Sequence, residues 1–226
     1  MSTEFLNYSG APLPARAVAD VLDSLRVLQR LAYLQSELYV RALAAPGFVL
    51  AAEKTVFDTL SSQETSHVST LSSLITTRLG TPVPKPTFDF TGKGAVPGFA
   101  FAAGQYETFR MLAQAFEDLG VRAYKGQVQP LQSDKSALNF VLAMHSVEGR
   151  HASEVRRIRG KKGWITGSSA DDLPAFAQPI YAGENVTTQG NVNVASSTIS
   201  ADAASQAFDE PLSTAQVTAI ITPFIT

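Results

Sequence analysis

The sequence predicts an all-α protein: an antiparallel four-helix bundle with one long crossover and an irregular C-terminal extension that ends in a short helix. Four long segments repeat apolar residues at helical spacing, and the connections between them are short, long and short in that order. Short connections favour antiparallel neighbours, whereas a long one can pass from one end of a bundle to the other. Two helical hairpins joined by a crossover account for this order.

The first hairpin is expected from helices over about 15–44 and 49–79. Pro46-Gly47 ends the first helix, and Gly80 ends the second. The crossover follows as TPVPKPTFDFTGKGAVPG, residues 81–98, in which proline and glycine exclude a helix.

The second hairpin is expected from helices over about 99–125 and 134–159, separated by the short GQVQPLQS. After residue 163 no sustained period remains, which predicts an irregular extension lying over the bundle. Ser213 before TAQVTAII is expected to cap a short terminal helix, with Pro223 as its stop. A chain of 226 residues favours one domain, so we predict the bundle over 1–164 and the extension over 165–226 within that domain.

Composition narrows the classes of partner and site. The net charge of −2 gives no broad attraction for nucleic acid or an anionic membrane, and no apolar run is long enough to span a bilayer. The chain has no cysteine, which excludes disulfides, thiolate metal sites and cysteine nucleophiles. The opening MSTEFLNYSGAPLP lacks the pattern of a secretory signal, so we expect a cytoplasmic protein or a processed exported form. Any metal would be bound by oxygen and imidazole.

Two Glu-x-x-His motifs indicate a metal site. Glu64 and His67 lie in the second predicted helix, and Glu148 and His151 lie in the fourth. Residues three apart share a helix face, so each motif can present a carboxylate and an imidazole to one point. The chain has only three histidines, so two in this spacing are hard to attribute to chance. The alternative is that both are ordinary histidines on helix faces.

A third carboxylate is expected from Glu117. It lies in the largely apolar stretch AQAFEDLG, where an unpaired carboxylate would be unfavourable to bury. A role as metal ligand removes that penalty, whereas the alternative is a surface ion pair with Arg122. Together with the two motifs, Glu117 supplies most of a site for two iron or manganese ions in a bundle interior.

The first helix lacks its matching ligand. Tyr124 follows Glu117 by seven residues, and Tyr39 occupies the equivalent place in the first helix, but seven residues before Tyr39 lies Ala32. This comparison suggests two related hairpins, of which one has lost a ligand. We expect both tyrosines to lie in the core and to donate hydrogen bonds to carboxylates.

Three residues are candidates to replace the missing ligand. Gln35, one turn from Ala32, offers a neutral oxygen. Glu37 is a stronger ligand but lies about 140° around the helix from Ala32. His145, one turn before Glu148, is expected to pack near the ligands or to support them, and it could also compensate for Ala32.

The chain resembles the ferritin-like domain family that includes bacterial proteins of unknown role and the plant desiccation-related proteins. The similar stretches are AYLQSELYVRAL (32–43), QETSHVSTL (63–71), FEDLGVRAY (116–124), SVEGRHASEVR (146–156) and FDEPLSTAQVTAIITPFI (208–225). They touch all four helices and the end of the extension.

This resemblance implies that Glu64 and Glu148 bridge two ions. Glu117 and His151 would then complete one metal position, and His67 would hold the other ion. The resemblance also implies that family members with the full site carry a glutamate where this chain has Ala32. The two positions should therefore differ in affinity.

We therefore expect a di-iron-carboxylate-type protein that binds one or two iron ions, or manganese, and acts on oxygen or peroxide or in iron and stress handling. The alternative is a metal-free structural or desiccation-protective protein that keeps the fold, for which Ala32 is the evidence. A third hypothesis, an oxygenase with an organic substrate, requires an open channel to the metals. Whether the chain is an enzyme stays open, and a homo-oligomer is compatible with the sequence.

Overall fold

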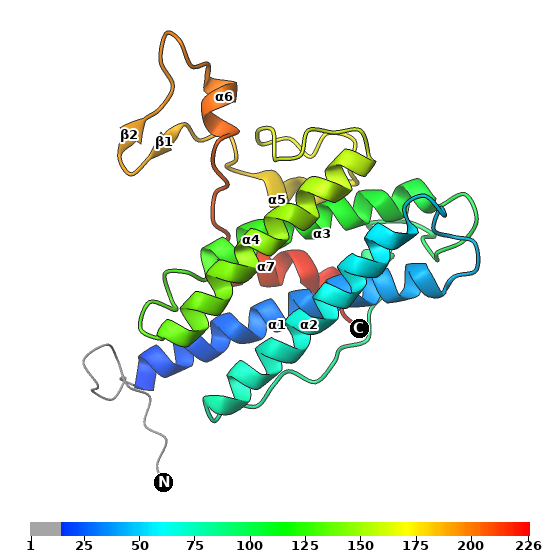
Figure 1. The fold of residues 1–226 in the computed structure, drawn as a ribbon, viewed down its shortest axis with the longest axis horizontal. Coiled ribbons are helices and arrows are strands. Elements are labelled where there is room, and N and C mark those ends of the chain that lie inside the picture. The colour runs from blue at the N-terminus through cyan, green and yellow to red at the C-terminus, as the bar shows by residue number, and fades with distance from the viewer. Residues whose placement is uncertain (1–14) are drawn as a thin grey trace.

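The computed structural model describes residues 15–226 and contains four long helices (Figure 1). They are α1 (Ala15–Ala44), α2 (Lys54–Thr77), α3 (Tyr106–Gly126) and α4 (Lys135–Ile158). None of the helices over this described range has both the length and the hydropathy that crossing a membrane requires. The segment on which the signal-peptide expectation rests, residues 1–14, lies outside the described residues.

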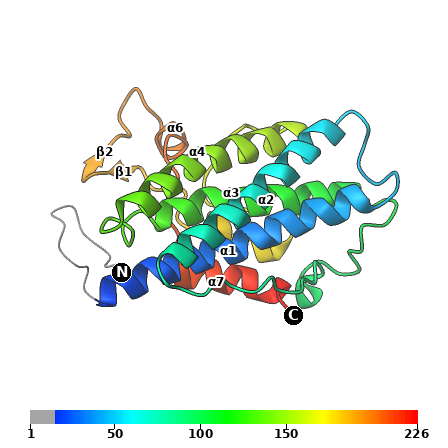
Figure 2. The same cartoon turned by 60° about the horizontal axis from the view of Figure 1, so that its bottom comes forward.

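The four helices pair as two hairpins. α1 packs along α2, and α3 packs along α4, whereas α2 and α4 make few contacts with each other. The terminal helix α7 (Thr214–Ile221) packs on both α1 and α3 (Figure 2). The α1–α3 side of the bundle is therefore covered.

The second helix begins at Lys54 and not near residue 49 as predicted. The apolar residues before it pack as turns instead of continuing a helix face. Phe48 is buried with its ring edge against Phe109, and the Tyr106 hydroxyl donates a hydrogen bond of 2.6 Å to Glu53. These contacts with α3 stabilise the turn before Lys54, so the helix does not extend further toward residue 49.

The third helix begins at Tyr106, so the predicted start near residue 99 is wrong. Gly98, Phe101 and Gly104 adopt positive φ angles of 70°, 54° and 84°, which a right-handed helix does not allow. The side-chain carbonyl of Gln105 also accepts hydrogen bonds from backbone N–H groups in this loop, including that of Ala100 at 2.9 Å. Phe99, which the predicted helix included, is instead a core residue on this loop.

The start of α4 is tied to the end of α2. Asp134 caps α4 by accepting a hydrogen bond of 2.9 Å from the Ala137 N–H. The Arg78 guanidinium, at the end of α2, donates to both carboxylate oxygens, with Nη2 at 2.6 Å from Oδ1. Burial would raise the pKa of Asp134, but Arg78 lowers it below 3.8.

The connection between α2 and α3 runs back along the bundle and meets the end of the chain (Figure 2). Phe88 forms an isolated antiparallel bridge with Ile225, and the Asp89 N–H donates to the Phe224 carbonyl at 2.9 Å. The Phe224 ring packs edge-on against Phe116 of α3. As predicted, Ser213 caps α7, here through a complete capping box.

The extension contains short elements that the sequence pattern did not reveal. They are α5 (Gln178–Tyr181), the hairpin β1 (Thr188–Gln189) and β2 (Val192–Asn193), α6 (Ala201–Ser205), and 3-10 turns at Ala175–Ala177 and Thr222–Phe224; a further turn, Gly92–Gly94, lies before α3. Arg122 of α3 forms a buried ion pair of 2.8 Å with Glu184. The Tyr181 hydroxyl donates to Asp118 at 2.5 Å. These contacts hold the extension on the bundle, while its division at residue 164 stays a prediction.

Replacing Asp134 with alanine should lower the free energy of unfolding by about 2–4 kcal/mol, because the cap is lost and the nearly buried Arg78 keeps no carboxylate partner. Asp58→Ala is the matched control: its ion pair with Lys54 is exposed, so we expect a loss of about 0.5 kcal/mol or less. Urea denaturation measures both values. Equal losses would contradict the role of Asp134.

The same pair predicts a dependence on pH. Because the folded pKa of Asp134 lies below its ordinary value of 3.8, its stabilisation is present above pH 3.8 and is lost as the pH falls through the folded pKa. Acidification from pH 5 to about pH 3 should therefore narrow the difference in stability between wild type and Asp134→Ala. A constant difference would count against this linkage.

Candidate metal centre

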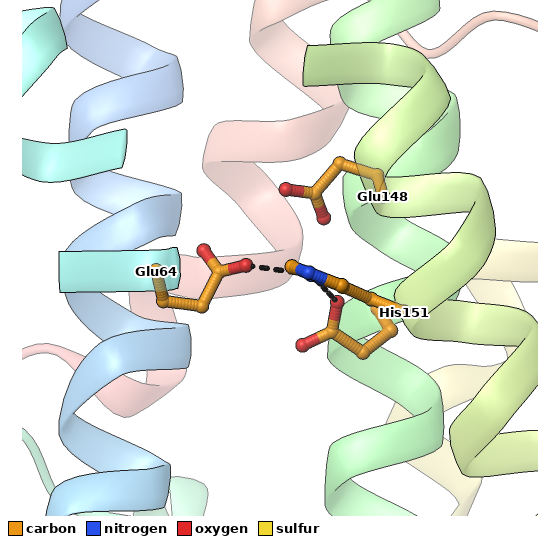
Figure 3. Close-up of side chains that lie close together, drawn as sticks. Glu64, Glu148 and His151 are labelled. Carbon is orange, nitrogen blue, oxygen red and sulfur yellow. Dashed lines mark ion pairs between the residues drawn. The ribbon is translucent and has the colours of Figure 1, made fainter. Parts of the chain in front are cut away.

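Five predicted ligand residues meet inside the bundle. Glu64 and His67 extend from α2, Glu117 from α3, and Glu148 and His151 from α4. The three glutamates are fully buried, and the two histidines are each 4% exposed. Figure 3 shows Glu64 reaching across toward Glu148 and His151. The helical spacing of both Glu-x-x-His motifs thus places their side chains on facing surfaces.

Glu64 lies between the two imidazoles. Its Oε1 is 2.9 Å from His151 Nδ1, and its Oε2 is 3.2 Å from His67 Nδ1. Glu117 Oε2 lies 3.3 Å from His151 Nδ1, whereas Glu148 Oε1 lies 3.2 Å from His67 Nδ1. The imidazole rings stack with their centroids 5.9 Å apart. Each imidazole therefore contacts two carboxylates and shares one of them with the other.

Four of these residues fit a cation. Ligand atoms of Glu64, Glu117, Glu148 and His151 all lie within 4.8 Å of one another. Each of the four has one buried atom that makes no hydrogen bond with any described residue: Glu64 Oε1, Glu117 Oε2, Glu148 Oε1 and His151 Nδ1. The atoms are close together without hydrogen-bond geometry, and buried polar atoms are rarely left in that state. A cation among them would give all four a partner, so this group could hold a metal ion.

Burial and mutual repulsion shift the pKa values of the cluster. Burial, together with the charges of Glu64 and Glu148, raises the pKa of Glu117 to about 7. Burial and the charge of Glu64 raise the pKa of Glu148, whereas both imidazoles outweigh burial and lower the pKa of Glu64. Burial would lower the pKa values of His67 and His151, but the carboxylates raise them to about 10 and 11. Protons on the two imidazoles thus offset part of the charge of the three carboxylates, and a bound metal would have to displace them.

The two core tyrosines differ in their partners. Tyr39 donates a hydrogen bond of 2.6 Å to Glu117 Oε1, as predicted. Tyr124 is equally buried, but its hydroxyl has no hydrogen-bond partner among the described residues, so the expected bond to a carboxylate is absent there. Its ring lies edge-on to His67, with the centroids 6.3 Å apart. Burial, then the neighbouring carboxylates, raise both pKa values well above 10, so both hydroxyls stay protonated.

Of the three candidates to replace Ala32, Gln35 alone reaches the cluster. Its Nε2 donates to Glu148 Oε2 at 3.0 Å, and its buried Oε1 has no hydrogen-bond partner among the described residues. Glu37 instead pairs with Arg41 and Lys85, at 2.7 and 2.6 Å.

His145 and Arg122, the other residues whose roles the sequence left open, make contacts outside the cluster. Nδ1 of His145 lies 3.0 Å from the Val121 carbonyl, so this histidine packs on α3. The alternative partner for Glu117, Arg122, pairs with Glu184 instead. Glu117 is therefore not part of a surface ion pair.

Sequence reasoning missed two residues that shape the cluster. Gly120 faces Glu148 so closely that a Cβ at this position would lie 2.0 Å from Oε2. A signal existed, because a glycine inside a helix and three residues after Glu117 shares its face. Gln63 Oε1 lies 2.6 Å from His151 Nε2, a contact between two helices that no local pattern reveals.

A groove of about 520 Å³ separates α2 from α4 and ends at the imidazoles of the cluster. Leu60, Phe140 and Met144 contribute apolar surface, and His67 and His151 form part of its wall. None of the three cluster glutamates, all of which are described, lines it. The groove therefore reaches the imidazoles but not the carboxylates. It does not provide the channel to the metal site that an oxygenase with an organic substrate would need.

Comparison with protein-family models identifies the family of the chain. Residues 20–161 match a family model described as a ferritin-like domain. This span covers more than half of the chain and includes all five residues of the cluster. A search of curated proteins gave no significant match.

Replacing Gly120 with alanine should lower the free energy of unfolding by about 1–3 kcal/mol, because the new methyl group would displace the Glu148 carboxylate. Gly149→Ala is the matched control on the next helix. A Cβ there meets no atom within 4 Å, so we expect a gain of about 0.5–1 kcal/mol from helix propensity. Urea denaturation with chelator present compares them. A stabilising Gly120→Ala would disprove the close approach.

Proposed function

Because the chain belongs to the ferritin-like domain family, we propose that its buried cluster binds iron at a di-iron-carboxylate-type site, with manganese as the other ion that the site accepts. The observation that carries the proposal is the set of four buried ligand atoms without hydrogen bonds in Glu64, Glu117, Glu148 and His151. Carboxylate and imidazole ligands suit both divalent ions.

The proposed site has two unequal positions. Glu117 and His151 would hold one ion together with Glu148 and with Glu64, which lies between both imidazoles. His67 would hold the other ion, with the Gln35 carbonyl oxygen as its neutral ligand from α1. Because a neutral oxygen replaces a carboxylate, we expect this second position to bind its ion more weakly.

Iron in such a ligand set supplies redox chemistry on oxygen or peroxide, which is the activity we propose. The chain's own residues prepare the site. Tyr39 fixes one oxygen of Glu117 and leaves the other free, while Gln35 does the same for Glu148. Gly120 leaves the room that the Glu148 carboxylate occupies. The Nδ1 atoms of His67 and His151 face Glu64 and would give up their protons to let an ion bind.

A second candidate is a metal-free structural or stress-protective protein that keeps the fold. It is favoured by the close contacts between imidazoles and carboxylates, such as His151 Nδ1 to Glu64 Oε1 at 2.9 Å. Protonated imidazoles would balance most of the buried charge without an ion. Ala32 also supports this candidate, since one ligand position carries a methyl group.

Metal content separates the candidates. Protein made in iron- and manganese-supplemented cells and purified without chelator should contain metal, measured by mass spectrometry of the elements. Glu148→Gln should reduce the metal per chain roughly tenfold or more, because the site loses a charged ligand shared by both positions. Glu154→Gln, a half-exposed residue on the same helix, should have no effect. Metal-free wild-type protein would favour the second candidate.

Restoring a carboxylate at position 32 should strengthen the weaker position. We expect Ala32→Glu to raise the number of tightly bound manganese ions from one to two per chain in equilibrium titrations, because His67 gains a charged ligand beside it. Ala32→Gln controls for side-chain size without charge and should give a smaller change. If Ala32→Glu binds no more tightly than wild type, position 32 does not face the site.

A further inference from the structure

The two hairpins place equivalent residues at the cluster. The offset along the sequence from Glu64 to Glu148 is the same as that from His67 to His151. A nearly equal offset relates Tyr39 to Tyr124, and the offset between these tyrosines also relates Ala32 to Glu117. Every member of one half therefore has a counterpart in the other, and only the glutamate of α3 is matched by a residue without a polar group.

The counterpart of one hydrogen bond is therefore missing. Tyr39 donates to Glu117 Oε1 at 2.6 Å, and the equivalent pair would be Tyr124 and residue 32. Ala32 carries only a methyl group, and the Tyr124 hydroxyl is fully buried with no partner among the described residues. A buried hydroxyl without an acceptor is unfavourable by about 1–3 kcal/mol. The orphan hydroxyl thus indicates that an acceptor belongs near Ala32.

The net charge of the cluster decides whether the missing acceptor can be an anion. Three glutamates face two imidazoles in the cluster. In metal-free protein the surrounding carboxylates repel an anion. With two divalent ions bound, the three carboxylates leave one positive charge without compensation, so an anion becomes favourable.

We propose that the metal-loaded site takes a small external carboxylate of the size of formate or acetate where the related hairpin has its glutamate side chain. One of its oxygens accepts the Tyr124 hydrogen bond, as Glu117 Oε1 accepts that of Tyr39, and the other completes the metal position of His67. A carboxylate reproduces the two contacts of the missing side chain with two separate oxygens, whereas a halide has a single atom for both. The inference rests on the proposed metal binding.

The size limit follows from the surroundings. Ala32 is fully buried, α7 packs on α1 and α3, and the groove between α2 and α4 does not reach the glutamates. Because Ala32 is shielded from solvent on these sides, we expect the subsite to admit only a short acid. One or two carbons match the part of a glutamate side chain that alanine lacks.

The test is a titration of the full metal-depleted chain with manganese, in sodium formate or in sodium chloride of equal ionic strength. Formate should raise the affinity of the weaker manganese position roughly tenfold or more. Tyr124→Phe should largely remove this gain, because the hydroxyl that holds the carboxylate is lost. Tyr39→Phe, the matched control, should keep it, since Tyr39 faces Glu117. In Ala32→Glu the internal carboxylate should make formate ineffective.

The outcomes distinguish this inference from the function on which it rests. Wild-type protein that binds no manganese or iron in either buffer would overturn the proposed function. Manganese binding that formate does not change, that chloride raises equally, or that keeps its full formate effect in Tyr124→Phe would overturn the carboxylate subsite alone. Tyr124→Phe keeps the test decisive if Ala32→Glu fails to fold, and circular dichroism checks each variant.

Discussion

Three fully buried carboxylates at one point inside the bundle are the constraint on which the rest of the structure depends. Glu64, Glu117 and Glu148 are fully buried and repel one another, so each needs a positive partner or a donor. His67 and His151 supply positive charge from the same helices as Glu64 and Glu148. The packing around the cluster holds these charges close together.

The two hairpins contribute unequally to the contacts that stabilise the buried carboxylates. In one half, Glu117 is held by the Tyr39 hydroxyl and faces His151. In the other, Ala32 offers no polar atom, and the α1 helix contributes the amide of Gln35 instead. The bundle thus keeps the geometry of a two-fold arrangement while its chemistry is asymmetric.

The sequence predicted the helical hairpins and the two Glu-x-x-His motifs because both depend on local spacing, and it predicted Glu117 from the apolar stretch around it. Glu64 and His67 share a helix face whatever surrounds them, and so do Glu148 and His151. Local patterns did not predict the loop before α3. Phe101 adopts a left-handed conformation there, which an aromatic residue in the sequence does not indicate. The contact of Gln63 with His151 joins residues far apart in the sequence and depends on how two helices are rotated.

The sparse packing between α2 and α4 has a mechanical consequence. Arg78 and Asp134 fasten the two helices at one end, and beside the groove the cluster joins them near their middle. An ion shared by Glu64 and Glu148 would close a long loop that contains the whole crossover and α3, much as a disulfide restricts the unfolded chain. The ion would then act as a reversible cross-link. A higher melting temperature would report a bound ion even when the ion has no visible absorption.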